Sequence, residues 1–272
     1  MSELLDNRSK KLRRDIVGVL AAGRRGHLAP AFSLVEILRV LYDDILRLDP
    51  DQPDWHRRDR FILSKGHGCI AQYVLLAEKG FISQQDLQAF CTLHGILGGH
   101  PEHTVNGIEA STGSLGHGLS IGIGFALAAR LEGSDARVFV VLGDGECNEG
   151  TVWEAAMSAA KHKLDSLTVL IDYNKQQSYG AVSEVMNPEP FADKWRAFGF
   201  HVDEVDGHDV VALRDVLGGV PVVRGKPNAI ICHTVKGKGV SFTENNSAWH
   251  HKSRITDEEL TALLNALEHC DA

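Results

Sequence analysis

Apolar residues recur at helical spacing over the first fifty positions of the chain. The positions that show this spacing are Leu4, Leu5, Leu12, Ile16, Val17 and Leu20. Ser33 and Glu36 have the spacing of a capping box, in which two side chains bind the backbone at the start of a helix. We therefore expect a mostly helical segment over residues 1–50, with one helix starting just after Ser33.

Short apolar runs of strand length follow, separated by stretches that are compatible with helices. These runs predict strands at residues 61–63, 137–142, 167–171 and 229–235. A further strand is expected at residues 200–205. A helix is expected at 210–217, and Thr256 with Glu259 predicts the capping box of a final helix. This alternation indicates an α/β fold, a mostly parallel sheet flanked by helices. We expect a single domain over residues 1–272.

Three stretches interrupt this alternation. Residues 113–131 are rich in Gly and Ala with bulkier apolar residues between them, which predicts a buried helix packed tightly against a neighbour, with or without a chemical role. Residues 174–190 and 236–253 show little periodicity and predict long loops at one edge of the sheet. Loops of that length in compact domains are usually functional.

Composition narrows the class of protein. The 272 residues carry 28 Lys and Arg against 36 Asp and Glu, a formal charge of −8, which argues against a nucleic-acid binder. The N-terminus is charged and no stretch reaches about 18 consecutive apolar residues, so we expect neither export nor a membrane segment. The five cysteines form no C-x-x-C pair, which favours reduced thiols and a cytoplasmic location.

The first candidate chemistry lies in Val138–Gly150, where a buried-looking strand ends in Gly143, Asp144 and Gly145. Ligands of parallel sheets collect at the carboxyl ends of the strands, and an Asp between two glycines can approach a ligand closely. Alone, the same pattern also suits an Asp that supports a turn. The next strand ends at Asn174, one crossover later, so Asp144 and Asn174 are expected side by side.

These polar groups predict a metal that bridges to a diphosphate. One carboxylate, one amide oxygen and a backbone carbonyl from the following loop form an incomplete shell of oxygen ligands. Mg²⁺ prefers an octahedral oxygen shell and is commonly bound by few protein groups together with phosphate oxygens. A diphosphate would complete that shell, and the metal would explain how an acidic protein holds a phosphate ligand.

The spacing of GDG and Asn174 resembles the thiamine diphosphate motif. From about Arg13 to about Lys252 the chain resembles the N-terminal, diphosphate-binding part of transketolase, because six motifs occur in the order of that family. The other five motifs are Gly26-His27, residues 63–68 (LSKGHG), residues 99–102 (GHPE), residues 112–116 (TGSLG), and residues 236–239 (KGKG) followed by Trp249-His250.

The resemblance implies how the cofactor would be held. It implies a Mg²⁺ or Ca²⁺ site formed by Asp144, Asn174 and the backbone carbonyl of Gln176. Thiamine diphosphate would contact Gly145 and the backbone of Gly113, Ser114 and Leu115. The side chains implied beside the diphosphate are Lys65, His67 and Lys236.

The resemblance also implies the substrate side of the site. The histidines that would face a sugar substrate are His27, His100 and His250, and His250 would also contact the cofactor. His251 remains an alternative to its neighbour His250. In the family, the acidic positions that match Glu149 and Glu154 lie at the subunit interface.

The implied activity is transfer of a two-carbon ketol unit from a ketose phosphate to an aldose acceptor, with thiamine diphosphate as the electron sink. The 272 residues do not include the pyrimidine-binding and C-terminal domains of the family. We therefore expect a split transketolase in which a second subunit supplies them. The paired sites of the family imply an α2β2 assembly.

Other functions fit parts of the pattern. The chain could belong to another thiamine-diphosphate enzyme, of the 1-deoxyxylulose-5-phosphate synthase or oxo-acid dehydrogenase E1 type, or be a non-catalytic scaffold subunit. Ser120 formally matches the G-x-S-x-G elbow of serine hydrolases, but that elbow requires a strand directly before it. Two residues depart from the transketolase pattern near the substrate end, Leu28 in place of a common Pro and His117 in place of a common Gln.

Overall fold

The computed structural model describes residues 5–268, and five strands in it form one parallel sheet in the order β1-β2-β3-β5-β4. The strands are β1 (Arg60–Leu63), β2 (Val138–Gly143), β3 (Leu167–Tyr173), β4 (His201–Asp206) and β5 (Asn228–His233). Each predicted strand is present, with ends within two residues of those expected. The parallel α/β fold class is therefore confirmed.

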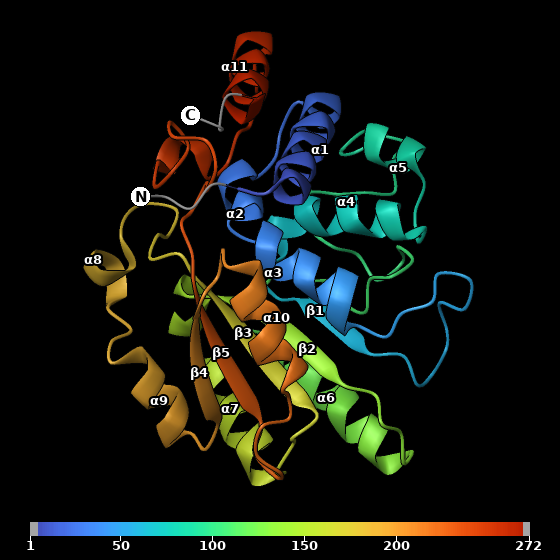
Figure 1. The fold of residues 1–272 in the computed structure, drawn as a ribbon, viewed down its shortest axis with the longest axis vertical. Coiled ribbons are helices and arrows are strands. Elements are labelled where there is room, and N and C mark those ends of the chain that lie inside the picture. The colour runs from blue at the N-terminus through green and yellow to red at the C-terminus, as the bar shows by residue number, and fades with distance from the viewer. Residues whose placement is uncertain (1–4, 269–272) are drawn as a thin grey trace.

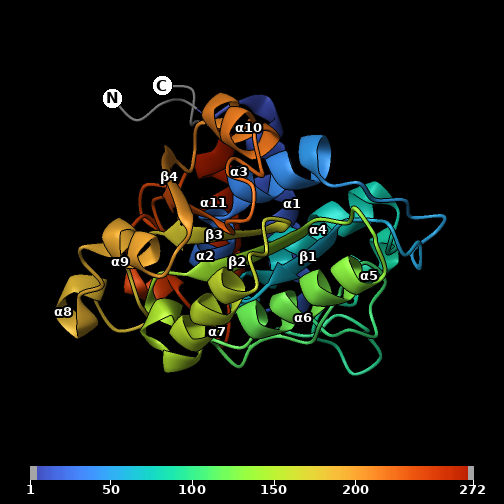
Figure 2. The ribbon, with the colours of Figure 1, turned by 90° about the horizontal axis from the view of Figure 1, so that it is seen from below.

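Helices cover both faces of the sheet (Figures 1 and 2). One face is covered by α6 (Gly118–Leu131), α7 (Gly150–Lys161) and α9 (Phe191–Ala197). On the opposite side lie α1 (Asn7–Gly23), α2 (Leu28–Phe32), α3 (Val35–Val40), α4 (Cys69–Lys79) and α10 (Val210–Gly218). Helix α11 (Asp257–Glu268) packs against α1, beyond the ends of the strands. Side chains of β2 alternate between the two cores, as the two-residue period of a strand requires.

Two short helices and four single turns complete the fold. The helices are α5 (Gln84–Gln88) and α8 (Val182–Met186), and the turns are Leu41–Ile45, Gly66–Gly68, Gly145–Asn148 and Ser247–Trp249. The loop predicted over 174–190 therefore contains one helix, α8. No helix within residues 5–268 is both long and apolar enough to cross a membrane.

The N-terminal helical segment is confirmed, but the capping box predicted within it is wrong. Leu4 lies outside the described residues, whereas the predicted apolar positions 12, 16, 17 and 20 are buried in α1. Ser33 follows α2, and its hydroxyl donates to the Pro30 carbonyl and the Asp172 carboxylate. Glu36 is buried and pairs with Arg13. Both side chains make tertiary contacts that a local spacing rule does not include.

The C-terminal elements agree more closely with the sequence pattern. Helix α10 matches the predicted helix at 210–217. The backbone nitrogen of Thr256 lies 3.0 Å from a Glu259 carboxylate oxygen, and the Glu259 nitrogen lies 3.2 Å from the Thr256 hydroxyl. The predicted capping box before α11 is therefore confirmed.

The glycine-rich stretch 113–131 differs from expectation in two ways. The helix, α6, begins only at Gly118, so residues 113–117 form a loop. One face of α6 packs on the sheet, where Gly122 lies against Val140. The opposite face is exposed, and Leu131 is 88% exposed. The prediction of tight packing is confirmed, but the helix is not buried on all sides.

The cysteines that the structure describes are Cys69, Cys91, Cys147 and Cys232, and all four are free thiols. Cys69, Cys147 and Cys232 are buried, and Cys91 is half-buried. Cys270 lies outside the described residues. The prediction of reduced thiols therefore holds for residues 5–268.

Candidate active site

The carboxyl ends of β1, β2, β3 and β5 converge on one cavity of about 590 Å³. β1 is followed by Lys65, β2 by Asp144, β3 by Asn174, and β5 by Lys236 after a short connection. Because β2 and β3 are adjacent and parallel, Asp144 and Asn174 leave the sheet at the same edge, as predicted.

Most of the predicted site residues line this cavity. They are His27, Lys65, His67, His100, Gly113, Leu115, Asp144, Gly145, Asn174, Gln176, Lys236 and His250. Ser114 is exposed and does not line it, and its hydroxyl lies 3.4 Å from Nδ1 of His117. Residues that are far apart in the sequence are thus gathered around one space.

Asp144 is a buried carboxylate that has no ion-pair partner within residues 5–268. Its oxygens accept hydrogen bonds from the backbone nitrogens of Gly145 at 2.7 Å and Lys175 at 2.5 Å. Burial, followed by the negative charge of Asp172, raises the pKa of Asp144 to about 7. A nearby cation would favour the charged form, so this carboxylate fits a bound metal ion.

Asn174 and the loop after it supply further oxygen atoms. The Asn174 amide nitrogen donates to Asp172 at 3.2 Å, and its amide oxygen accepts from the Gln176 nitrogen at 3.1 Å. The Lys236 ammonium donates to the carbonyls of Gln176 at 3.0 Å and Gln177 at 3.2 Å. The three groups predicted to bind a metal therefore border the same cavity.

The chemistry of these donors suits a hard cation. Mg²⁺ and Ca²⁺ prefer carboxylate, amide and carbonyl oxygens, which are the groups that Asp144, Asn174 and Gln176 would supply. Within the described part of the chain, no group of three or more His, Cys, Asp or Glu side chains could hold a metal. The fit therefore depends on amide and backbone oxygens as well as the single carboxylate.

Two buried lysines place ammonium groups at the cavity although the chain is acidic overall. Lys65 is 1% exposed and forms an ion pair with Asp172. Lys236 is 3% exposed, and burial, followed by the charge of Lys65, lowers its pKa to about 8. Ammonium groups at this position suit the phosphate end of a ligand.

Five histidines form a cluster, and four of them, His27, His67, His100 and His250, line the same cavity. The ring centroid of His27 lies 5.6 Å from His67, 5.9 Å from His100, 5.5 Å from His250 and 4.6 Å from His251. Burial and then the neighbouring positive groups lower the pKa of His27 and of His250 to about 3. A neutral imidazole has one donor and one acceptor nitrogen, which suits proton transfer at hydroxyl groups.

The structure distinguishes His250 from His251. His250 lines the cavity, its Nε2 lies 3.1 Å from the Ser178 hydroxyl, and its Nδ1 is buried without a hydrogen-bond partner. His251 is exposed and does not line the cavity. The geometry therefore favours His250 for the substrate-facing position.

Glu146 was not predicted from the sequence, yet it holds the loop 113–117 in place. Its buried carboxylate accepts hydrogen bonds from the backbone nitrogens of Gly116 at 2.8 Å and Gly143 at 3.0 Å, and from the Ser64 hydroxyl. Within this loop Gly113 has a φ of 135°, and a Cβ there would lie 3.0 Å from the His100 ring. The loop can approach the cavity this closely because residue 113 is glycine.

Asp172 is the second site residue that was not predicted. It is fully buried and accepts hydrogen bonds from Ser33, Lys65, Asn174 and Thr234. Burial alone would raise its pKa, but the charge of Lys65 and these hydrogen bonds lower it. The available sequence signal was a single carboxylate within an otherwise apolar strand.

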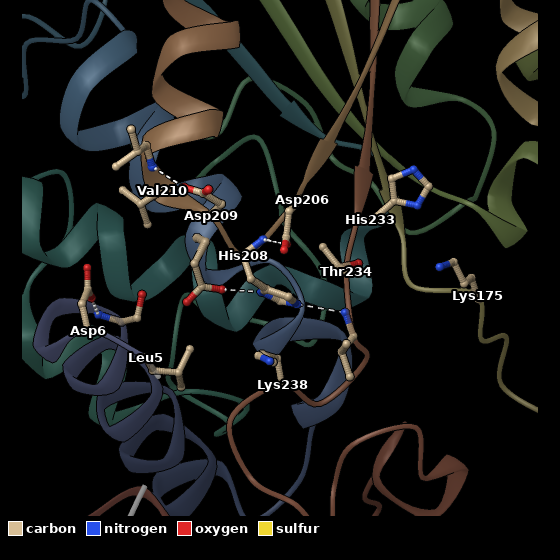
Figure 3. A pocket seen from close by; sticks show the side chains of 14 residues that line it. Leu5, Asp6, Lys175, Asp206, His208, Asp209, Val210, His233, Thr234 and Lys238 are labelled. Carbon is tan, nitrogen blue, oxygen red and sulfur yellow. Dashed lines mark hydrogen bonds and ion pairs between the residues drawn. The ribbon is translucent and has the colours of Figure 1, made fainter. Parts of the chain in front are cut away.

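A second cavity, of about 760 Å³, lies beyond the ends of β4 and β5 (Figure 3). His208, which lines it, places Nδ1 2.8 Å from a Glu36 oxygen and accepts from the Val235 nitrogen at 2.9 Å through Nε2. Asp209 caps α10 by accepting from two of its backbone nitrogens. His208 and Asp209 already make hydrogen bonds within the protein. The cavity of about 590 Å³ is therefore the better candidate site, although it is smaller than this second cavity.

Three further predicted residues lie on the surface. Ser120 is the third residue of α6 and follows a loop, so the strand that a hydrolase elbow requires is missing at this place. Glu149 and Glu154 are both exposed, and Glu149 lines the mouth of the site cavity. Their role at a subunit interface stays a prediction.

Comparison with known proteins gives a consistent result. Residues 6–269 match the family model described as "Transketolase, thiamine diphosphate binding domain". The chain is 42% identical over 249 residues to an apulose-4-phosphate transketolase subunit of Phocaeicola vulgatus, covering 92% of this chain and 89% of that protein. It is 40% identical over 261 residues to 6-deoxy-6-sulfo-D-fructose transketolase subunit SqwG of a Clostridium species, covering 95% and 93%.

Solved structures show the same relationship. The fold superimposes on transketolase from Campylobacter jejuni with a TM-score of 0.89 at 29% sequence identity. The match covers 96% of this chain but only 42% of the longer chain. The chain thus spans about two fifths of that solved protein and nearly the full length of the two relatives named as subunits.

Proposed function

The chain belongs to the transketolase family, and residues 6–269 match the thiamine-diphosphate-binding domain of that family. On this basis we propose that the chain is one subunit of a split, two-chain transketolase. It would transfer a two-carbon ketol unit from a ketose phosphate to an aldose acceptor. A second subunit would supply the pyrimidine-binding and C-terminal domains, in an α2β2 assembly. The observation that carries the proposal is the cavity at the strand ends, where carboxylate, amide, ammonium and imidazole groups meet.

The residues of this chain would hold the phosphate end of the cofactor. Asp144, Asn174 and the Gln176 carbonyl would bind Mg²⁺ or Ca²⁺, which would neutralise the buried Asp144 charge. Lys65 and Lys236 would add positive charge beside the diphosphate. Thiamine diphosphate supplies the electron sink needed to break and form a carbon–carbon bond beside a carbonyl.

The histidines would handle protons on the substrate side. His27, His100 and His250 line the cavity, and their lowered pKa values keep the rings neutral near neutral pH. Each ring could therefore accept a hydroxyl proton through one nitrogen and donate a hydrogen bond through the other. Such groups are needed because ketol transfer removes a proton from one sugar hydroxyl and returns one to another oxygen.

The names of the relatives suggest which donors to examine. One relative is named for apulose 4-phosphate and another for 6-deoxy-6-sulfo-D-fructose, so the two names contain different sugars, each with an anionic group. We propose a ketose with an anionic group as the donor of this chain. A donor panel should therefore contain both phosphorylated and sulfonated ketoses.

Reconstitution tests the proposed function. The chain would be purified alone and also co-expressed with the product of a neighbouring gene that encodes a pyrimidine-binding domain. With Mg²⁺, thiamine diphosphate, a donor ketose and an aldose acceptor, ketol transfer is expected only from the co-expressed pair, because each chain would contribute half of a site. Product sugars are measured by chromatography.

An inactive complex provides the control for this experiment. Asp144→Ala in the co-expressed pair should abolish transfer while leaving the complex assembled, which gel filtration verifies. Full activity from the purified single chain would contradict the split-site proposal. Absence of thiamine diphosphate binding in the assembled pair would contradict the assignment of the cavity itself.

A further inference from the structure

We propose that Asp172 is a positioning residue, which turns the amide oxygen of Asn174 toward the metal site and holds the Lys65 ammonium beside the diphosphate. The inference rests on the proposed function, because it concerns how the metal and the diphosphate are held. Asp172 itself does not line the cavity. It would therefore act through the residues that it contacts.

Asp172 lies at a junction between four segments of the chain. It is the penultimate residue of the central strand β3 and is 0% exposed. Its carboxylate accepts from Ser33 after α2 at 2.7 Å, from Asn174 after β3 at 3.2 Å, and from Lys65 after β1 and Thr234 after β5. One buried side chain thus connects the segments that leave the sheet at the site.

The contact with Asn174 decides which end of its amide faces the metal site. A primary amide has a donating nitrogen on one side and an accepting oxygen on the other. The nitrogen of Asn174 donates to Oδ2 of Asp172, so Oδ1 is turned toward the loop, where it accepts from the Gln176 nitrogen at 3.1 Å. Of the two amide atoms, only Oδ1 can bind a hard cation. By accepting from the amide nitrogen, Asp172 therefore holds Asn174 in the orientation that can bind a metal.

The contact with Lys65 fixes the second group. Oδ2 of Asp172 accepts from both Lys65 and Asn174, so the two side chains are held relative to each other by one oxygen atom. Ser33 and Thr234 also bind the carboxylate but do not line the site cavity. These two bonds involve no residue that lines the cavity, whereas the bonds of Asp172 to Lys65 and Asn174 position two residues that do.

Removing a residue that hydrogen-bonds to a metal ligand typically weakens metal binding by about 10-fold to 100-fold. Removing Asp172 alone would also leave Lys65 buried without a counter-charge, which destabilises a protein. The test is therefore made in a Lys65→Met background, where no buried ammonium remains beside Asp172. Binding of Mn²⁺ alone, without thiamine diphosphate, is measured by calorimetry on the full chain in complex with its second subunit.

Two double variants separate charge from orientation, because Lys65→Met alone would leave the buried Asp172 carboxylate without a counter-charge. Lys65→Met with Asp172→Asn removes the charge but keeps an acceptor oxygen for Asn174, and Lys65→Met with Asp172→Leu removes both. We expect Mn²⁺ to bind about 10-fold or more weakly to the Leu variant than to the Asn variant, because only the Leu variant frees the Asn174 amide.

Matched controls remove other bonds to the same carboxylate. Ser33→Ala and Thr234→Val each delete one donor to Asp172 but leave its contacts with Asn174 and Lys65. Both are expected to bind Mn²⁺ within about 3-fold of the unmodified complex. Equal affinities of the Asn and Leu variants, or losses in these controls as large as in the Leu variant, would overturn the role of Asp172.

A measurement on the unmodified protein does not depend on the folding of any variant. The amide protons of the Asn174 side chain should exchange slowly with water in nuclear magnetic resonance spectra, because one of them is bound to the buried Asp172. Fast exchange would overturn the inference. A complex that binds no Mn²⁺ at all would instead contradict the proposed metal site.

Discussion

At the scale of single residues, burial shifts acids and bases in opposite directions, and both shifts favour neutral groups. The pKa of Asp144 rises to about 7, whereas those of His27 and His250 fall to about 3. The histidines therefore stay neutral across the physiological range. Asp144, and Lys236 with its pKa lowered to about 8, are groups of this site that exchange a proton near neutral pH.

The sign of the Asp144 effect on stability follows from its raised pKa. In the metal-free protein the folded state binds this proton more tightly than the unfolded state, whose value is near 3.8. The stabilisation is complete below about 3.8 and is lost as pH rises through about 7. In the proposed complex a metal ion would take the place of this proton.

We predict that metal binding weakens as Asp144 takes up its proton. The apparent affinity for Mn²⁺ alone should be nearly constant above about pH 7 and fall by up to about 10-fold per unit below it, because metal and proton compete for one carboxylate. Calorimetry between about pH 5.5 and about pH 8 measures this slope. An affinity that does not change across the interval would show that Asp144 is not a ligand.

At the scale of elements, helix α6 shows how small residues allow a helix to approach a sheet. A Cβ on Gly122 would lie 2.6 Å from a methyl carbon of Val140 in β2, which is closer than real contacts allow. A Cβ on Gly124 would meet nothing within 4 Å. Glycine at position 122 thus allows close packing against the sheet, whereas glycine at position 124 only lowers the stability of the helix.

Alanine substitutions at these two glycines should have opposite effects. Gly124→Ala is expected to raise the free energy of unfolding by about 0.5–1 kcal/mol, because alanine loses less backbone entropy in a helix. Gly122→Ala should lower it by about 1–3 kcal/mol through overpacking against Val140. Urea denaturation followed by circular dichroism measures both, and changes of the same sign would contradict this account.

At the scale of the whole molecule, a buried polar network joins the N-terminal helices to the site. The Arg13 guanidinium, 0% exposed, donates to both carboxylate oxygens of Glu36 at 2.6 Å and 3.0 Å. Glu36 also contacts His208, which in turn accepts from the Val235 nitrogen (Figure 3). Val235 directly precedes Lys236, so the network anchors the backbone that carries this lysine.

Breaking this network should destabilise the whole fold. Glu36→Gln would leave the buried Arg13 charge without a counter-charge, and the free energy of unfolding should fall by about 3–5 kcal/mol. Lys11→Ala removes only two surface ion pairs, with Asp15 and with Glu78, so it should change the free energy of unfolding by less than about 1 kcal/mol. Urea denaturation compares the two variants. A Glu36 variant as stable as the Lys11 control would contradict a structural role for the network.

Sequence patterns were sufficient for the strands of the fold and for the residues of the site that stand in motifs. The positions of β1, β2, β3 and β5 followed from apolar runs, because burial on both faces of a parallel sheet requires continuous apolar residues. The positions of Asp144 and Asn174 followed from the rule that parallel strands end at the same edge. Those arguments need only local periodicity and the direction of the chain.

Only the tertiary structure revealed the residues that support the site from behind. Ser33 and Glu36 have the spacing of a helix cap, yet both are used in buried contacts with residues more than 20 positions away. Asp172 and Glu146 belong to no sequence motif used in the prediction, because their hydrogen-bond partners come from other strands and loops. A buried polar group must bind whatever donor the fold places beside it, so its role is decided by proximity in space, which sequence separation does not encode.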